Sequence, residues 1–579
     1  MEKSNDINNA ESTLMVKSNY FQLKFLPINI YKYNVQITPT IRHENEIINV
    51  VKKYIKQNVL LSECYYENGY IYSRSLIISD QIRNNIVSLG KGFNSNRFTI
   101  NLKETGQLNS LDKSGINLQN FFHFYMQKSK KLINTGIFVQ NEYSFPNDRI
   151  SVIVGFGFSI IPMAEPLILI SRQVITFDGK IQIYDYKLFS EEADKVFSNE
   201  LNCGPVKEFE FFRKCCEEIE NCVESFGIKI NSYETNGILL SHPKIIPDSP
   251  DKPFFRKPSK TINFAILCFH PFDSDKMKEF EDSFVEKAKK FGMNFEKCFD
   301  TKFIDTRKES EIAAVFQNLK IRDIHFVFIG LSQRSRNDNI FEKIKYKAAS
   351  DYGLVTQIVL IEKLQLKEQK PEFYDSLAIT SCLKLGGQPN IIDQAYWNCF
   401  PFEPETTMVV GTSFKFLKLN NNRKNLFSHS MVASIDTDFC QNISIERFSL
   451  KPNDEKLFEE LFEDLLEEYH KEHGQYPKNI IIFHGKRYTD LKYAAKSIDE
   501  RIKVTSFSID KSSPIRFIKK NDEKVPIGIC VDLKFQQSNC STKEFAICSE
   551  NESEAVRYKT TKYTVINDDS GMSDIQIKR

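Results

Sequence analysis

Apolar and polar residues alternate over the first part of the chain, as they do in strands with one buried face. The run from Asn19 to Pro39 predicts two such strands, and further strands are expected at residues 71–78 and 97–102. Between them, apolar side chains recur at helical spacing over residues 44–58, which predicts a helix. Residues 1–16 are polar and are expected to be disordered.

Longer apolar segments follow. Residues 116–137 predict a helix, and its apolar side is formed by Phe121, Phe122, Tyr125 and Met126. Residues 152–170 are almost long enough to cross a membrane, but they contain Glu165 and two prolines. Two buried strands around a turn are therefore favoured over a membrane span. Residues 208–230 predict a helix that runs into a strand, whereas the pattern is weak over 178–205.

Strands and helices alternate after a proline-rich linker at residues 243–258. The expected order starts with a strand and ends with a helix, at residues 262–269, 275–291, 321–331, 340–350, 354–361 and 372–384. This rhythm predicts a doubly wound, Rossmann-like α/β domain. A second α/β unit is expected from about residue 405, with strands and one helix at 408–411, 431–436, 453–470 and 479–485.

Composition and charge limit the class of protein. The chain has 78 basic and 76 acidic residues, a net charge of +2, which excludes a wholly basic nucleic-acid coat but allows a local basic patch. The 13 cysteines include no CxxC pair, and the nine histidines show no zinc-ligand spacing. We therefore expect a reducing compartment and no bound structural metal. The polar N-terminus has no apolar segment of the kind found in signal peptides.

One segment resembles a known family. Residues 341–364 and 374–393 read FEKIKYKAASDYGLVTQIVLIEKL and YDSLAITSCLKLGGQPNIID. An aromatic residue, a lysine four positions on, a GxxTQ strand and a helix ending in KLGG follow one another in this order. The segment is similar to the part of Argonaute proteins that grips the 5′ phosphate of a small guide RNA.

The resemblance implies a role for each matching position. Phe341 would stack on the first base of the guide, and Lys345, Gln357, Thr380 and Lys384 would surround its 5′ phosphate. The spacing agrees, because Phe341 and Lys345 are four residues apart on one helix, as are Thr380 and Lys384 on the next. Lysine and amide donors that converge on one point suit a phosphate, and an aromatic ring suits a base.

Two of these positions depart from the family. Phe341 replaces a tyrosine and loses a hydroxyl contact, and Thr380 replaces a lysine and loses a charge. Each lost charge-assisted hydrogen bond costs roughly 1.5–3 kcal/mol, so we expect weaker binding of a monophosphate or a preference for another 5′ end. The resemblance also places Arg334 and Arg336 in the loop that discriminates the first base, and Lys559 near a guide phosphate. It implies no cofactor other than, optionally, a divalent ion at the 5′ phosphate.

The resemblance extends more sparsely along the chain, from about residue 17 to 569, and implies a multidomain α/β architecture. The expected parts are a disordered N-terminus (1–16), an α+β N domain (17–113), a first linker region (114–200), a second linker (201–257), a Rossmann-like MID domain (258–402), a truncated RNase H-like PIWI domain (403–569) and a tail (570–579). About thirty residues separate the features of the two linkers. The PAZ barrel, which holds the guide's 3′ end in the family, does not fit there and is expected to be absent or vestigial.

The nuclease site of the family is predicted to be inactive. Active PIWI domains use carboxylates to hold two divalent ions. Ser413 and Lys486 stand where the resemblance places the two aspartates, and Glu446 and Asp454 both match the glutamate. A lysine about 4 Å from a divalent ion is repelled by roughly 8 kcal/mol at an effective dielectric of 20. The final acid or histidine would follow the segment VINDD, but the chain stops ten residues later.

A basic run beside this site points to a different use. Between Glu405 and Asp436 there is no acid, and the cations are Lys415, Lys418, Arg423 and Lys424. Such a run predicts a surface for a nucleic-acid backbone and not a metal site.

Together these observations predict a catalytically inactive Argonaute that binds a small single-stranded guide RNA and pairs it with a complementary target RNA. Silencing would then come from effector proteins that it recruits. The alternative is a degenerate Argonaute that no longer binds RNA and serves as a protein scaffold or as a competitor in the silencing pathway. An active nuclease with a rearranged site is the third hypothesis. We expect the protein in the cytoplasm or the nucleus, without membrane association.

Overall fold

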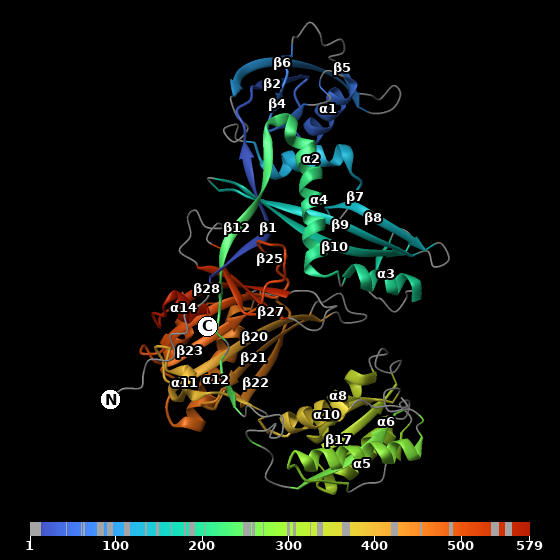
Figure 1. The fold of residues 1–579 in the computed structure, drawn as a ribbon, viewed down its shortest axis with the longest axis vertical. Coiled ribbons are helices and arrows are strands. Elements are labelled where there is room, and N and C mark those ends of the chain that lie inside the picture. Colours follow the sequence, from blue (N-terminus) through green and yellow to red (C-terminus); the bar gives the residue numbers. More distant parts are fainter. Residues whose placement is uncertain are drawn as a thin grey trace.

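A computed structural model describes the chain from residue 13 to residue 578, apart from a set of excluded positions. These are 42, 59–60, 62–63, 78–85, 90–95, 109–115, 134–135, 146–149, 164, 179–180, 184–190, 202, 242, 247–255, 257–260, 270, 272, 298–301, 305–308, 325, 333–339, 362–370, 389, 418–425, 452–453, 486–489, 534–542 and 551–558. Arg334, Arg336 and Lys486 are therefore outside the described residues. The described strands form four sheets, covered by helices (Figure 1).

The first unit is a five-stranded sheet packed against one helix, at the top of Figure 1. Its strands, in spatial order, are β3 (Tyr65–Glu67), β4 (Tyr70–Ser73), β2 (Ile30–Thr38), β6 (Asn96–Leu108) and β5 (Ile86–Leu89). The expected helix is confirmed as α1 (Glu44–Gln57), which buries Val50, Val51, Tyr54 and Ile55. Because these residues recur at three- and four-residue spacing, they form one apolar face.

A 16-stranded sheet connects distant parts of the chain. Its path begins in the C-terminal part with β22 (Asn442–Ser449), β21 (Leu426–Ser434), β20 (Thr407–Leu417), β23 (Asn479–His484), β24 (Lys503–Asp510), β28 (Lys559–Asp568), β27 (Glu544–Glu550) and β26 (Ile529–Asp532). It continues through β12 (Ile228–Leu239), β1 (Thr13–Phe25), β10 (Leu167–Asp178), β9 (Ile150–Ile161), β8 (Ile137–Phe145) and β7 (Leu132–Ile133). Two short strands, β11 (Ile181–Ile183) and β25 (Phe517–Lys519), pair with β10 and β1.

Several expectations for the N-terminal half need correction. Residues 13–16, expected to be disordered, belong to β1, where Val16 is fully buried. The helix expected over 116–137 is α2 (Leu118–Ser129), which ends early because the chain is extended at Lys130 and residues 132–133 pair with β8 as β7. The apolar segment 152–170 is confirmed as two antiparallel strands, β9 and β10. None of the described helices is both long and apolar enough to span a bilayer.

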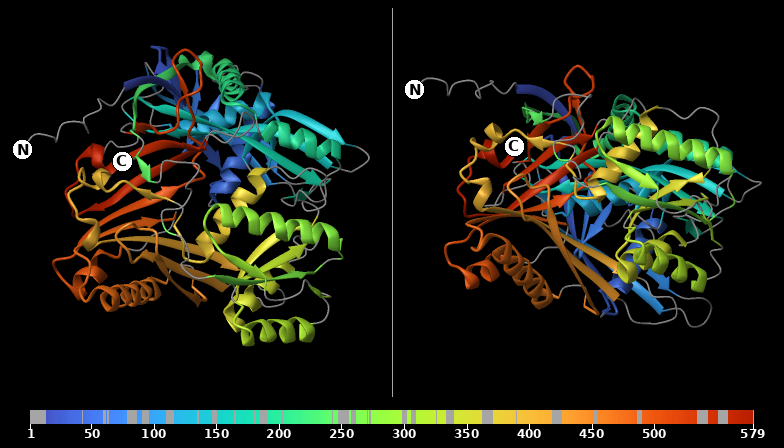
Figure 2. Two further views of the ribbon diagram at one scale, coloured as in Figure 1. Left: turned by 60° about the horizontal axis from the view of Figure 1, so that its bottom comes forward. Right: turned by 90° about the horizontal axis from the view of Figure 1, so that it is seen from below.

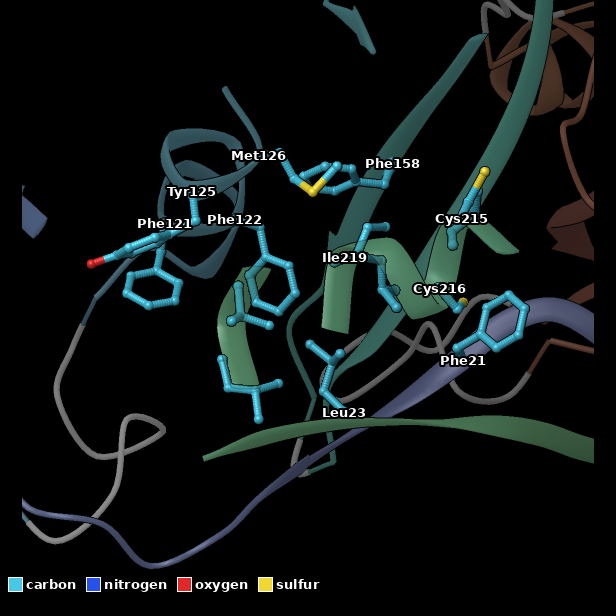
Figure 3. Close-up of a cluster of buried hydrophobic side chains, with 14 of the residues drawn as sticks. Phe21, Leu23, Phe121, Phe122, Tyr125, Met126, Phe158, Cys215, Cys216 and Ile219 are labelled. Carbon is cyan, nitrogen blue, oxygen red and sulfur yellow. The ribbon is translucent and has the colours of Figure 1, made fainter. Parts of the chain in front are cut away.

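A buried aromatic core lies where α2 meets α4 (Pro205–Val223) and the sheet (Figure 3). Its labelled members come from β1, α2, β9 and α4, and are Phe21, Leu23, Phe121, Phe122, Tyr125, Met126, Phe158, Cys215, Cys216 and Ile219. Between β11 and α4 the described residues form α3 (Glu191–Leu201), in the region where the pattern was weak.

The third unit confirms the doubly wound expectation (lower right of Figure 1). Its sheet has the order β15 (Phe295–Lys297), β14 (Ile262–Cys268), β17 (Phe326–Leu331) and β18 (Val355–Leu360), with β16 (Lys302–Phe303) also paired to β14, and each of these pairs is parallel. One face packs on α5 (Ser274–Lys290) and α10 (Pro371–Lys384), and the other on α6 (Glu309–Ile321) and α8 (Ile340–Tyr352). Burial on both faces is typical of parallel sheets.

The C-terminal unit places helices on one side of strands β20–β24. Helix α12 (Glu455–His473) buries Leu461, Phe462, Leu465 and Leu466 against these strands and ends at Gly474, which has a left-handed backbone. Helix α13 (Lys492–Ile498) follows β23. Residues 570–579 were expected as a tail, but they include α14 (Asp574–Lys578), in which Ile577 and Lys578 are buried.

Candidate nucleic-acid interface

The segment that resembles Argonaute proteins folds into α8, β18 and α10. Gly353 has a φ of +67°, which lets the chain leave α8 and enter β18 at the GxxTQ motif. The KLGG motif ends α10 in the same way: Gly386 has a φ of +79°, and the amide of Gly387 donates to the carbonyl of Cys382 at 2.8 Å. The two glycine positions thus set where α8 and α10 end and where their last side chains lie.

Two lysines interact electrostatically although their helices, α8 and α10, cover opposite faces of this sheet. The Nζ of Lys384 donates to the carbonyl of Thr356 on β18 at 2.6 Å. Partial burial lowers the pKa of Lys384, and the charge of Lys345 on α8 lowers it further. Among the described residues Lys384 has no carboxylate partner. An anion beside Lys384 would be favoured by its own charge and by that of Lys345.

Gln357 is the next residue along β18 after the carbonyl that Lys384 contacts. Its Nε2 donates to the carbonyl of Ile358 at 3.0 Å. Its Oε1 is buried and has no hydrogen-bond partner among the described residues. Nε2 carries two N–H groups, and the carbonyl of Ile358 uses one of them, so the other can serve as a donor to a phosphate.

The structure gives less support to the other three predicted positions, Thr380, Phe341 and Lys559. The hydroxyl of Thr380 donates to the carbonyl of Ser376 one turn back at 2.7 Å, so it is used within α10. Phe341 and Lys559 lie in α8 and β28, but their side chains are outside the described part of the structure. Lys345 and Lys384 therefore influence each other electrostatically, whereas their role at a phosphate and the stacking ring stay predictions.

The position expected for the first catalytic aspartate lies on an open sheet surface. Ser413 on β20 is exposed and pairs with Ser430 on β21, which in turn pairs with Glu446 on β22. With strands about 4.8 Å apart, Glu446 is about 10 Å from Ser413, too far to share a metal ion. Asp454 accepts from Ser449 at 2.6 Å and interacts with His429, on the face that packs against α12.

Polar groups at the ends of β23 and β28 are paired internally, which the sequence did not indicate. Asp569 contacts Lys492 at 2.6 Å and Lys496 at 3.4 Å. Burial opposes ionisation of Asp569, but these two lysines outweigh it and lower its pKa. The i, i+4 spacing of the two lysines on α13, together with the acidic pair at 568–569, is the signal that could have revealed the cluster.

The ring of His484 also has a hydrogen-bonding partner. Its Nδ1 lies 3.2 Å from the hydroxyl of Thr412, and burial lowers its pKa to about 4. Asp568 accepts from the amides of Gly571 and Met572 and from Thr505. His484 and Asp568 thus have protein partners where a two-metal nuclease site would have side chains free to bind metal ions.

The described residues do not fit the divalent ions that an RNase H-like nuclease requires. Ser413 supplies a hydroxyl where a carboxylate is needed, Asp569 is paired with two lysines, and Asp568 accepts hydrogen bonds from backbone amides. In the described part of the chain no three His, Cys, Asp or Glu side chains gather closely enough to hold a metal ion.

Sequence reasoning also missed a contact between the Rossmann-like unit and the C-terminal unit, and a nearby cavity. Gln388, 2% exposed, donates from Nε2 to Asp436 at 3.1 Å. A cavity of about 1050 Å³ lies between the segment 397–406, the end of α12 and the start of β24. Aromatic residues such as Trp397 and Tyr476 line it together with Arg501. It does not include the lysine pair on α8 and α10.

Residues 326–579 match the family model of the Piwi domain. No curated protein sequence matches the chain. The structure is similar to that of Drosophila Piwi, with a TM-score of 0.69 and 14% identity over 98% of this chain and 93% of that one.

Two Argonaute structures give similar values. The fold matches Kluyveromyces polysporus Argonaute with a guide RNA (TM-score 0.68, 13% identity, 99% of this chain and 91% of that one). It also matches Clostridium butyricum Argonaute bound to a guide DNA and a target DNA (TM-score 0.70, 13% identity, 98% and 94%). Residues 326–579 therefore match a Piwi domain, and the chain has the multidomain α/β fold of these Piwi and Argonaute structures.

Proposed function

We propose that this protein binds a small single-stranded guide RNA by its 5′ phosphate and uses the guide to recognise a complementary target RNA without cutting it. The observation that carries the proposal is the position of Lys384, whose Nζ is held at the carbonyl of Thr356 beside Gln357 and within the electrostatic influence of Lys345. A 5′ phosphate with a charge near −2 would neutralise both lysines and remove their mutual repulsion.

The similar structures support this proposal by what they contain. One is an Argonaute with a guide RNA, and another is an Argonaute bound to a guide DNA and a target DNA. If this chain binds a guide in the same way, the 5′ end of the guide would lie between α8 and α10. Silencing would then depend on effector proteins, in the cytoplasm or the nucleus.

The absence of cleavage is a second part of the proposal. It is supported by Ser413, by the internal pairing of Asp569 and by the neutral ring of His484. Incubation of the guide-loaded protein with a matched RNA and Mg²⁺ or Mn²⁺ should leave the RNA intact. A specific cut opposite the guide would refute this part.

The binding test compares 5′-phosphorylated and 5′-hydroxyl guides of one sequence. We expect Lys345→Ala plus Lys384→Ala to lower affinity for the phosphorylated guide by 100-fold or more, since two charge-assisted bonds are worth about 3–6 kcal/mol. Lys347→Ala, on the same helix two residues from Lys345, is the matched control and should change affinity by less than about twofold.

An alternative function is favoured by Thr380, whose hydroxyl is used within α10 and adds no charge to the site. In that case the protein would bind no guide and would act as a scaffold or competitor. Unchanged RNA recovery after both lysine substitutions would refute the phosphate site. The absence of any bound RNA in the wild-type protein would favour the scaffold.

A further inference from the structure

Gln388 connects the Rossmann-like unit to the C-terminal unit. It lies just beyond α10, four residues after Lys384, and is 2% exposed. Its Nε2 donates to Oδ2 of Asp436, in the turn between β21 and β22, at 3.1 Å. Figures 1 and 2 show the Rossmann-like unit, lime to yellow, beside the orange C-terminal unit. A buried side chain of one unit thus binds a carboxylate of the other.

Asp436 is itself fixed within the C-terminal unit. Its Oδ1 accepts from the backbone amides of Cys440 and Gln441 at 2.8 and 2.7 Å. The carbonyl oxygen of the preceding residue, Ile435, lies 2.8 Å from Nε2 of His473 in the last turn of α12. Since the turn uses Oδ1, Oδ2 is left to accept from the other unit. The C-terminal unit therefore sets the position of this carboxylate.

The chain between Gln388 and Lys384 has little freedom to move. The backbone of Gln388 exchanges two hydrogen bonds with that of Arg256, at 2.7 and 2.9 Å. A Cβ added at Gly387 would lie 2.2 Å from Sγ of Cys382 and 3.1 Å from the carbonyl oxygen of Arg256, so the turn is tightly packed. Cys382 is fully buried in the last turn of α10. A shift of Gln388 is therefore transmitted to the end of the helix that carries Lys384.

We propose that Gln388 and Asp436 are positioning residues of the guide site, because their hydrogen bond fixes the end of α10 and so the place of the Lys384 ammonium. Neither residue touches the guide, and neither is among the positions that the resemblance matches. The C-terminal unit acts through this bond on the affinity for a 5′ phosphate. By thermodynamic linkage, a phosphate bound at Lys384 strengthens the contact between the two units by the same factor.

The inference rests on the proposed guide binding and adds the residues that position its site. The test compares the affinities of the full chain for 5′-phosphorylated and 5′-hydroxyl guides of one sequence, and the ratio of the two is the readout. Gln388→Glu places two carboxylates against each other. We expect affinity for the phosphorylated guide to fall about tenfold, as when one charge-assisted hydrogen bond is lost. Affinity for the hydroxyl guide should change by less than about twofold, since that guide makes no such bond.

Further variants separate positioning from a loss of folding. Gln388→Glu plus Asp436→Asn exchanges donor and acceptor, because the asparagine Nδ2 can donate to the new carboxylate while its Oδ1 still accepts from the turn. We expect this pair to bind the phosphorylated guide more tightly than Gln388→Glu alone. Gln388→Met, which removes the donor without adding a charge, should lower the ratio in the same direction as Gln388→Glu. Gln317→Glu, at an exposed glutamine on α6 of the same unit, is the matched control.

The outcomes separate the two proposals. If Lys345→Ala plus Lys384→Ala removes the preference for a 5′ phosphate but Gln388→Glu and Gln388→Met leave it unchanged, the positioning inference is wrong and guide binding stands. An equal loss for both guides, or no recovery in the paired variant, would likewise overturn it, since the bond would then serve folding alone. If the wild-type protein binds neither guide, both proposals fail together.

Discussion

In the α8–β18–α10 region, two like charges interact, and partial burial and the charge of Lys345 lower the pKa of Lys384. At the strand ends of the C-terminal unit the arrangement is the reverse, because Asp569 lies between Lys492 and Lys496. We propose that the first region binds an anion, whereas Asp569 in the second already has its counter-ions. Acidic residues at a strand end therefore do not by themselves indicate a metal site, because the fold can supply their counter-ions.

The largest effect that we expect at the second region is a pH dependence due to His484. Burial lowers its pKa from 6.5 to about 4, so the folded protein keeps the ring neutral while the unfolded chain takes up a proton below 6.5. The free energy of unfolding should therefore fall by about 3 kcal/mol between pH 6.5 and pH 4 and then level off. Urea denaturation across this range should show a smaller fall for His484→Asn; equal slopes for both proteins would show that this ring is not the cause.

A smaller effect is expected when the counter-ions of Asp569 are removed. Lys492→Ala plus Lys496→Ala leaves a partly buried carboxylate without cations, so the free energy of unfolding should decrease by about 2 kcal/mol at pH 7. Adding Asp569→Asn to the double variant should restore part of the loss. Lys503→Ala, an exposed lysine on β24, is the control for loss of a cation. If the double variant has the same free energy of unfolding as the wild-type protein, the two ion pairs do not stabilise Asp569.

The smallest effect is expected from a substitution that adds positive charge to the α8–β18–α10 region. Thr380→Lys adds a third cation one helical turn from Lys384, and we expect about tenfold tighter binding of a 5′-phosphorylated guide. Thr380→Met gives a side chain of similar reach without charge. If both variants bind the guide equally well, the gain does not come from charge.

The sequence predicts the parts of the fold whose pattern is local. Helices α1, α5, α8, α10 and α12 follow from helical spacing of apolar residues, and the parallel strands β14, β17 and β18 follow from short apolar runs between them. Short elements such as β5, β7 and α14 were missed, because they contain few residues and depend on contacts with distant segments. The continuity of the 16-stranded sheet has no local signal at all.

The candidate site could be predicted in the same uneven way. The order of residue types in two segments identifies Lys345 and Lys384, which influence each other electrostatically in the structure. The hydroxyl bond that occupies Thr380 depends on its rotamer, and the pairing of Asp569 depends on where α13 lies beside β28. Neither is encoded in a spacing that can be read along the chain. The contact between Gln388 and Asp436 depends on how two units meet, which single-sequence patterns do not show.

The pairing of β1 with β25 has a consequence for how the protein is made. Lys17 and Asp522, which form an ion pair at 3.1 Å beside this junction, are 505 residues apart. A ribosome adding roughly 5–20 residues per second would need on the order of 25–100 seconds to supply the second strand. For that time Val16, Lys17 and Ser18 present backbone groups whose partners on β25 do not yet exist. Nascent chains therefore expose a strand edge that invites pairing with neighbouring polysomal chains, and holdase chaperones should raise the yield of this protein more than that of one with local strand order.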